Sequence, residues 1–114
     1  YERLYDEFRA LGIDDVYCVS VNDAFVMNAW AQQLGIQKVK MLPDGNGDFT
    51  RLMGMLVSKS SIGFGDRSHR YAAVLTDMVR EKLFTEPGRE DNFAGDPYGE
   101  SSPENVLQYL RSLA

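Results

Sequence analysis

Cysteine and histidine are almost absent from this sequence, whose 114 residues contain one of each, Cys18 and His69. A single cysteine excludes a disulfide within these residues. One cysteine and one histidine also cannot complete a four-ligand zinc site without two carboxylates. We therefore expect no metal and no cofactor, and a lone thiol suits a reducing compartment, for which we predict the cytoplasm.

Basic residues and long apolar runs are scarce as well. Lys and Arg number 12 against 17 Asp and Glu, which gives a net charge of -5. A negative surface is a poor match for nucleic-acid phosphates and cannot act as a polybasic membrane anchor. No apolar run approaches the roughly 18 to 20 residues that span a bilayer, and no charged and then apolar leader opens the sequence. We expect a soluble protein that binds neither nucleic acid nor membranes.

What the sequence does contain is the composition of one folded domain, 44% hydrophobic and 25% charged, and we expect a single domain over residues 1–114. The spacing of apolar residues in the first half alternates between helix and strand patterns. The predicted elements are an amphipathic helix over 1–11 ended by Gly12, a central parallel strand covered on both faces over 16–21, a helix capped by Asn22 and Asp23 and ended by Gly35, a strand over 38–42, a turn over 43–47 and a helix over 49–57.

The second half of the sequence predicts a hairpin, an exposed loop and a closing helix. Two apolar runs flank a short polar connection, and a later stretch is too rich in Gly, Pro, Asp, Asn and Ser to form a core element. The predicted elements are a glycine-punctuated loop over 62–68, strands over 71–75 and 79–85 joined by Thr76-Asp77-Met78, a loop over 87–102 and a helix that begins at Ser102 and Pro103. The whole order predicts an α/β fold with a mixed sheet sandwiched by helices, and the thioredoxin-like topology fits it.

The beginning of the first helix has no capping residue. Its apolar stripe starts at Tyr1 with no Ser, Thr, Asp or Asn ahead of it to accept hydrogen bonds from the free N–H groups, and no initiator Met is present. We therefore expect the sequence to begin inside a helix, with the N-terminal portion of the domain missing.

Two glycine-containing motifs suggest ligand sites but are incomplete. Residues 44–48 (DGNGD) supply the first three ligand positions of a calcium-binding EF-hand loop, yet Phe49 stands where the loop requires glycine and Met55 where it requires glutamate. A turn with a helix cap is the better interpretation. Gly63-Phe64-Gly65 resembles half of a dinucleotide-binding fingerprint, but it follows no predicted strand and lacks the third glycine.

The remaining candidates are the lone thiol and a basic tract. Cys18 lies inside an apolar strand, where a thiol is usually a small buried hydrophobe and not a thiolate, so we predict a structural role. The tract Arg67-Ser68-His69-Arg70 concentrates positive charge before a strand, and either an anion or thiolate pocket or a surface salt-bridge cluster fits this pattern. We predict that His69 is a bystander, because no Ser or Cys is placed by the sequence to pair with it.

Four stretches agree in order and spacing with one known family. They are 17–30 (YCVSVNDAFVMNAW), 43–50 (PDGNGDFT), 53–57 (MGMLV) and 63–71 (GFGDRSHRY). Together they closely resemble the peroxiredoxin-5 class, including the bacterial forms fused to glutaredoxin. The resemblance implies a thioredoxin-like (redoxin) fold and a thiol peroxidase of antioxidant defence and redox homeostasis, which reduces hydrogen peroxide and alkyl hydroperoxides through a cysteine sulfenic acid.

The resemblance also implies site residues. Arg70 matches the family's catalytic arginine, which holds the cysteine thiolate and polarises the peroxide O–O bond. Arg67 matches a basic position that supports the substrate pocket, and Phe64 matches an aromatic residue that helps to wall it. Cys18 matches a strand cysteine that does not react with peroxide. The reacting cysteine belongs to a motif, Pro-x-x-x-Thr-x-x-Cys, that the resemblance places a few residues before Tyr1.

The partners implied by the resemblance are a hydroperoxide substrate, a thiol reductant (glutathione, glutaredoxin or thioredoxin) and a second copy in a homodimer. His69 and Ala72 stand where relatives often have Trp and Ser, and the 88–101 loop has its own composition. The reductant, the preferred hydroperoxide, the number of participating cysteines and a fused glutaredoxin domain therefore stay open. Two alternatives remain, a non-catalytic redoxin-fold binding or scaffold module without the reacting thiol, and a fragment of an enzyme that is inactive by itself.

Overall fold

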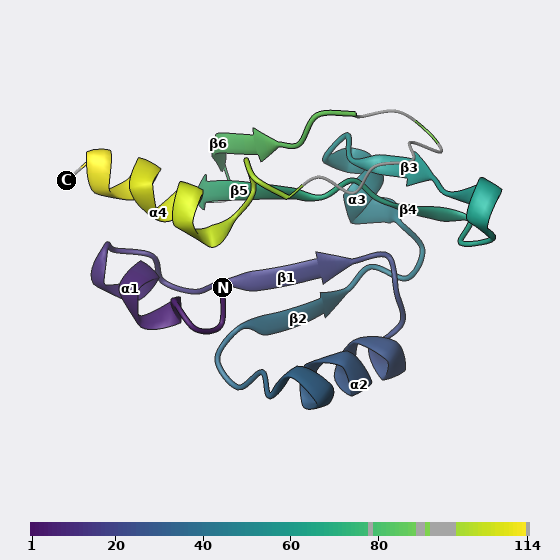
Figure 1. Cartoon of the computed structure of the whole chain (residues 1–114), viewed down its shortest axis with the longest axis horizontal. Coiled ribbons are helices and arrows are strands. Elements are labelled where there is room, and N and C mark those ends of the chain that lie inside the picture. Colours follow the sequence, from purple (N-terminus) through teal and green to yellow (C-terminus); the bar gives the residue numbers. More distant parts are fainter. Residues whose placement is uncertain (78, 89–90, 92–97, 114) are drawn as a thin grey trace.

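The structure, a computed structural model, describes residues 1–77, 79–88, 91 and 98–113 (Figure 1). In chain order its elements are α1 (Tyr5–Ala10), β1 (Tyr17–Ser20), α2 (Ala24–Leu34), β2 (Lys40–Pro43), α3 (Asp48–Leu52), β3 (Leu56–Ser58), the 3-10 helix η1 (Ser60–Ile62), β4 (Asp66–Ser68), β5 (Tyr71–Thr76), β6 (Val79–Thr85) and α4 (Pro103–Ser112). Within the described ranges, none of the helices has the length and apolar character needed to cross a bilayer.

Three two-stranded ladders carry the strand pairing in the described part of the chain. β1 and β2 run parallel with Tyr17 opposite Lys40, and beyond the last pair Asp44 donates its N–H to the Ser20 carbonyl at 2.8 Å. β3 and β4 are antiparallel, as are β5 and β6. The predicted parallel strand, the hairpin and the mixture of pairings are confirmed. Among the described residues, however, β1 pairs with β2 alone and is half-buried, so it is neither central nor covered on both faces.

α2 confirms the predicted cap and stop. The Asp23 carboxylate accepts a hydrogen bond from the Val26 N–H at 2.8 Å, and Gly35 ends the helix with a φ of 69°, a left-handed conformation that favours glycine. The buried side chain of the helix is Met27, whereas Phe25 is 87% exposed. Periodicity therefore predicted the helix but not which of its faces is buried.

Two predictions for residues 49–68 are wrong. The helix predicted over 49–57 ends at Leu52, because Gly54 takes a left-handed φ of 73° that breaks the helical path. The residues beyond it form β3, in which Val57 is buried, and β3 pairs with β4 where a loop was predicted. By periodicity a short apolar run fits a strand or a helix equally well, so the presence of a strand to pair with decides which of the two forms.

α1 is shorter than the helix predicted over 1–11. The first four residues form a turn, in which the Leu4 N–H bonds to the Tyr1 carbonyl three residues earlier at 3.2 Å. This spacing is tighter than that of an α-helix, so α1 begins one turn later than the apolar stripe, at Tyr5 and without a side-chain cap. Gly12 follows the helix with a φ of 94°, in line with the predicted stop.

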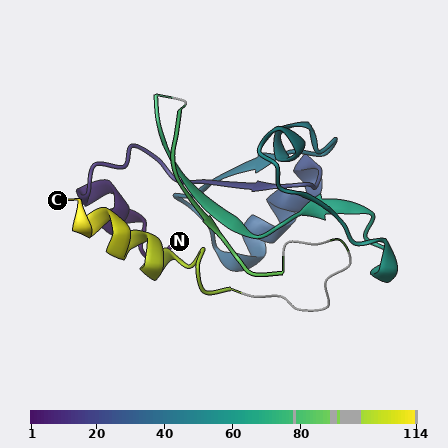
Figure 2. The ribbon, with the colours of Figure 1, turned by 90° about the horizontal axis from the view of Figure 1, so that it is seen from above.

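The main core lies where α1 and α4 pack on the β5–β6 hairpin. The two helices lie side by side at one end of the molecule (Figures 1 and 2), and an exposed ion pair between Arg111 and Glu7 at 3.0 Å joins them. α4 begins as predicted, with the Ser102 hydroxyl accepting from the Asn105 N–H. The buried side chains of this core are Leu4, Phe8, Val74, Phe84, Val106, Leu107 and Leu110. The core thereby fixes the two segments that border the site, β5 and the chain before α4.

Parts of two predicted elements lie outside the described residues. These are Met78 of the hairpin connection and residues 89–90 and 92–97 of the predicted loop. On either side of the first gap Thr76 pairs with Val79, which confirms the hairpin.

Candidate functional site

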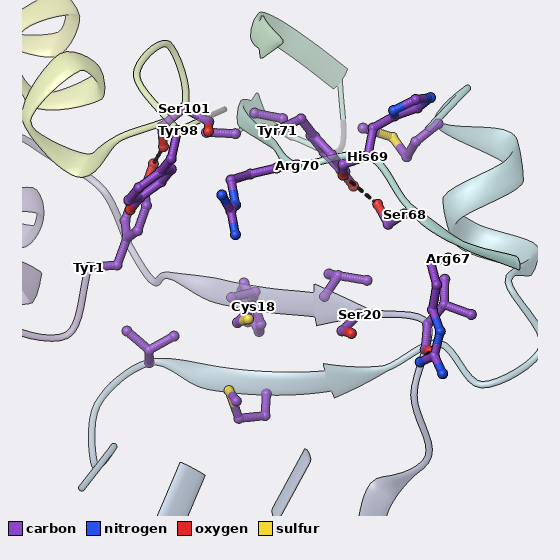
Figure 3. Close-up of a pocket in the computed structure, with 18 of the residues that line it drawn as sticks. Tyr1, Cys18, Ser20, Arg67, Ser68, His69, Arg70, Tyr71, Tyr98 and Ser101 are labelled. Atoms are coloured by element: carbon purple, nitrogen blue, oxygen red, sulfur yellow. Dashed lines mark hydrogen bonds between the residues drawn. The ribbon is translucent and has the colours of Figure 1, made fainter. Parts of the chain in front are cut away.

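A cavity of about 730 Å³ lies between β1 and β5 (Figure 3). β1 forms one wall, the chain from the end of β4 into β5 forms the opposite wall, and Tyr1, Tyr98 and Ser101 stand at one end. The cavity thus brings together parts of the chain that are distant in the sequence. Of the predicted site residues, Arg67 and Arg70 belong to its lining.

Arg70 immediately precedes β5, and its guanidinium points into the cavity toward β1 (Figure 3). The Tyr98 ring lies against it, with the guanidinium carbon 4.9 Å from the ring centroid, which is within the range of a cation–π contact. The neighbouring His69 side chain points to the other side of the chain, as expected for consecutive residues in an extended segment. The His69 N–H bonds to the Met55 carbonyl at 2.7 Å. The arginine, and not the imidazole, is therefore directed at β1.

Arg67, in β4, uses its guanidinium to hold neighbouring segments. Its Nη1 donates to the Val21 carbonyl at 2.9 Å and to the Asn22 Oδ1 at 2.6 Å. Its Nε donates to the Phe64 carbonyl at 3.0 Å. These bonds tie β4 to the end of β1, so Arg67 braces one wall of the cavity, and direct contact with a substrate stays a prediction.

Phe64 stands between Gly63 and Gly65, whose left-handed φ angles of 79° and 67° form a turn that glycine adopts most readily. Its side chain is exposed, and the ring lies 5.6 Å from the guanidinium carbon of Arg67. Phe64 is not part of the cavity lining. Its place in the wall of the site therefore stays a prediction. Phe64 is connected to the cavity through its contact with Arg67, which does line it.

Cys18 lies in β1, on the wall of the cavity that faces Arg70, and is half-buried. Burial raises the pKa of its thiol, so at neutral pH a smaller fraction is thiolate than in a free cysteine. This agrees with the predicted structural role and disfavours Cys18 as a nucleophile.

A buried carboxylate that the sequence did not single out borders the cavity. Glu86 follows β6 and is 6% exposed. It accepts hydrogen bonds from the N–H groups of Gly99 at 3.0 Å, Glu100 at 3.1 Å and Ser101 at 2.6 Å, and from the Ser101 hydroxyl. Burial alone would raise the pKa of Glu86, but these hydrogen bonds lower it to about 2. We refer to the Glu86 carboxylate with residues 99–101 as the Glu86 anchor.

Neither Glu86 nor Tyr98 carries a signal in the sequence. Glu86 borders the segment predicted to be an exposed loop and Tyr98 lies within it, and the composition of a loop does not indicate its contacts. A glutamate is rarely buried, but the burial of Glu86 follows only from the placement of β6 and α4. Tyr98 in turn meets Arg70 only through tertiary structure.

Asp44 confirms the turn and helix cap that we preferred to a calcium site. Its carboxylate accepts hydrogen bonds from the N–H groups of Phe49 at 3.2 Å and Thr50 at 2.8 Å, and from the Thr50 hydroxyl at 2.6 Å. The carboxylate is thus engaged at the start of α3. Across the residues that the structure describes, no three His, Cys, Asp or Glu side chains come close enough together to hold a metal ion.

The chain matches the family model described as Redoxin over residues 1–96. The chain belongs to the redoxin family. It is 61% identical over 113 residues to the peroxiredoxin y4vD of Sinorhizobium fredii and 46% identical over 110 residues to the hybrid peroxiredoxin hyPrx5 of Haemophilus influenzae. These matches cover 99% and 96% of this redoxin chain, but 60% and 44% of the relatives. The chain therefore spans only part of the length of either relative.

Solved structures agree with this assignment. The crystal structure of the Plasmodium falciparum antioxidant protein, a 1-Cys peroxiredoxin, has a TM-score of 0.94 at 37% identity and covers 98% of this chain and 64% of that one. Peroxiredoxin 5 from Alvinella pompejana has a TM-score of 0.81 at 31% identity, covering 98% and 66%. The thioredoxin-like redoxin fold and the likeness to the peroxiredoxin-5 class are confirmed.

Proposed function

We propose that this chain is the main part of a peroxiredoxin, a thiol peroxidase that reduces hydrogen peroxide and alkyl hydroperoxides. The observation that carries the proposal is the Arg70 guanidinium, which points into a cavity of a redoxin fold (Figure 3). When a peroxide O–O bond breaks, negative charge moves to the leaving oxygen, and a guanidinium with several N–H donors stabilises that charge. The identities to named peroxiredoxins support the same reaction.

In the proposed reaction a cysteine thiolate attacks the terminal oxygen of the hydroperoxide. An S–O bond forms as the O–O bond breaks, the sulfur gives up an electron pair, and the departing oxygen takes a proton and leaves as water or an alcohol. The cysteine is left as a sulfenic acid. Arg70 holds the thiolate and polarises the O–O bond. A reductant thiol then attacks the sulfenic sulfur, which releases water and forms a mixed disulfide that a second thiol reduces.

The reacting thiol is proposed to lie outside these residues. Cys18 is disfavoured because burial raises the pKa of its thiol, whereas a nucleophilic cysteine needs a lowered pKa. The match covers only 60% of the Sinorhizobium relative, so a longer polypeptide has room for the Pro-x-x-x-Thr-x-x-Cys motif that the family resemblance implies. By itself this chain is expected to be inactive.

Arg67 and Phe64 are proposed to act indirectly. Arg67 holds β4 against the end of β1 through its bond to the Val21 carbonyl, and Phe64 packs beside Arg67. The reductant is proposed to be glutathione, glutaredoxin or thioredoxin. The choice among them, the number of participating cysteines, the homodimer and the cytoplasmic location stay predictions.

The test uses the longer polypeptide that contains this chain, treated with hydrogen peroxide and dimedone, which forms a stable thioether with sulfenic acids. We expect peptide mass spectrometry to place the adduct on a cysteine other than Cys18, and we expect peroxide to be consumed when a thiol reductant is supplied. A Cys18→Ala variant is the control and should keep the adduct. A polypeptide that has no such cysteine, or that forms adducts on Cys18 alone, contradicts the proposal and favours a non-catalytic redoxin-fold binding module.

A further inference from the structure

The Glu86 anchor fixes the segment that carries Tyr98. The Glu86 carboxylate accepts hydrogen bonds from three consecutive backbone N–H groups, those of Gly99, Glu100 and Ser101. Consecutive N–H groups that converge on one anion define the local backbone conformation. Tyr98 directly precedes this turn. Although Tyr98 is 54% exposed, its backbone is therefore held in place by a buried carboxylate at the end of β6.

The same turn is tied to the main core from another direction. The Tyr1 hydroxyl donates a hydrogen bond to the Ser101 carbonyl. The Tyr1 ring stacks on Phe8 with the ring centroids 5.5 Å apart, and Phe8 is buried in the main core. The turn is thus attached at two points, so a shift of the backbone next to Tyr98 requires one of these attachments to give way.

Tyr98 in turn covers one side of the Arg70 guanidinium, 4.9 Å from the ring centroid, while the guanidinium points toward β1 (Figure 3). A long arginine side chain otherwise samples many rotamers, and ordering it costs free energy. An aromatic ring on a fixed stretch of backbone reduces the number of directions open to the guanidinium. The buried carboxylate, the turn and the ring therefore form one chain of contacts that ends at Arg70.

We propose that Glu86 is a positioning residue for Arg70 and acts through the turn at residues 99–101 and the ring of Tyr98; this inference rests on the proposed role of Arg70 in peroxide reduction. Glu86 itself touches neither peroxide nor thiolate. By holding Tyr98 it keeps the guanidinium directed into the cavity before the peroxide arrives, which lowers the cost of orienting it in the transition state. Loss of the carboxylate changes the orientation of Arg70 first, and the reaction rate through it.

The orientation of Arg70 is measured without any reaction by NMR of the longer polypeptide. Because the centroid of the Tyr98 ring lies 4.9 Å from the guanidinium carbon, we expect the ring current to shift the Arg70 Nε–Hε resonance. We expect Glu86→Gln and Tyr98→Ala each to move it toward the value of a free arginine, and Tyr98→Phe, which keeps the ring, to preserve the shift. Glu100→Gln, which removes an exposed carboxylate from the same turn, is the matched control and should not move it.

An Arg70 resonance that stays in place in the Glu86→Gln protein overturns the inference. A milder variant covers the case in which that protein does not fold. Ser101→Ala removes one hydroxyl donor from the carboxylate and leaves the backbone donors. It should produce a shift in the same direction and of smaller size, and an unchanged resonance in this folded protein also overturns the inference.

A double-mutant cycle on the rate constant for hydrogen peroxide separates positioning from general loosening. Glu86→Gln should slow the reaction by about tenfold when Arg70 is present. In an Arg70→Ala background it should slow the reaction by less than about twofold, because the group that it positions is gone. Equal slowing in both backgrounds overturns the inference. If Arg70→Ala alone leaves the rate unchanged, the proposed role of Arg70 fails, and the NMR result then stands as a structural coupling without a catalytic consequence.

Discussion

The guanidinium carbon of Arg70 lies 4.9 Å from the centroid of the Tyr98 ring, although one residue precedes β5 and the other lies in the segment before α4. The two meet because the main core holds α4 against the β5–β6 hairpin and because Glu86 holds the turn that follows Tyr98. The Tyr98 ring thereby lies against a guanidinium that points into the cavity (Figure 3). The proposed chemistry therefore depends on packing between segments that are far apart in the sequence.

Glu86→Gln should lower the free energy of unfolding at pH 7 by about 1–3 kcal/mol, because an amide satisfies fewer of the converging donors than a carboxylate does. Urea unfolding followed by circular dichroism measures the difference, and Glu100→Gln is the matched control. We expect the control to change stability by less than about 0.5 kcal/mol, as surface substitutions usually do.

The stability that Glu86 contributes should also disappear in acid. Burial alone would raise the pKa of Glu86, but its hydrogen bonds lower it from 4.5 to about 2. The charged form is therefore favoured by folding, so its contribution is complete above the unfolded pKa and is lost as the pH falls from about 4.5 toward 2. The difference in the free energy of unfolding between the parent protein and Glu86→Gln should shrink over the same pH interval. A difference that stays constant or grows in acid contradicts the hydrogen-bonded carboxylate.

Arg67→Lys should destabilise the protein by about 1–3 kcal/mol, because one ammonium group cannot reproduce three bonds that run to acceptors in different directions. Amide exchange should become faster over residues 60–66. The matched control is Arg51→Lys. Arg51 forms an exposed ion pair with Asp48 at 3.5 Å, and such a pair contributes only about a few tenths of a kcal/mol to the free energy of unfolding. Equal losses of stability in the two variants would show that Arg67 does not brace the cavity wall.

Cys18 should be slow to react in the folded protein. Burial raises the pKa of its thiol, so at pH 8 the thiolate fraction, and with it the rate of alkylation by iodoacetamide, should be lower in the folded protein than in the urea-unfolded chain. The unfolded chain is the control, since the same thiol is then exposed. A folded protein whose Cys18 reacts as fast as the unfolded chain would reopen the case for Cys18 as a nucleophile.

The helix ends that depend on neighbouring residues could be predicted from the sequence. Asp23 and Ser102 cap their helices and Gly35 ends α2 as predicted, because such a cap is a hydrogen bond between residues three apart and needs no tertiary partner. The β3–β4 pair could not be predicted, because it requires two separate segments to meet. Without that partner, the periodicity extended a helix past Gly54, to residue 57.

For the site, the sequence indicated residues but not their contacts. The family resemblance singled out Arg70, which the structure directs into the cavity. It also singled out Arg67 and Phe64, of which one binds backbone carbonyls and the other lies outside the cavity lining. Glu86 borders, and Tyr98 lies within, a segment whose composition predicts only a loop, and their contacts follow from how the hairpin and α4 pack.

The most direct measurement is the rate constant for hydrogen peroxide, by stopped flow, of the longer polypeptide and of its Arg70→Ala and Arg80→Ala variants. Arg80 is an exposed arginine of β6 and controls for the loss of one positive charge. We predict that Arg70→Ala lowers the rate constant by about 10²–10³, while Arg80→Ala stays within about twofold of the parent protein. An Arg70→Ala protein that reacts as fast as Arg80→Ala would contradict the central claim, that this redoxin chain supplies the arginine of a thiol peroxidase.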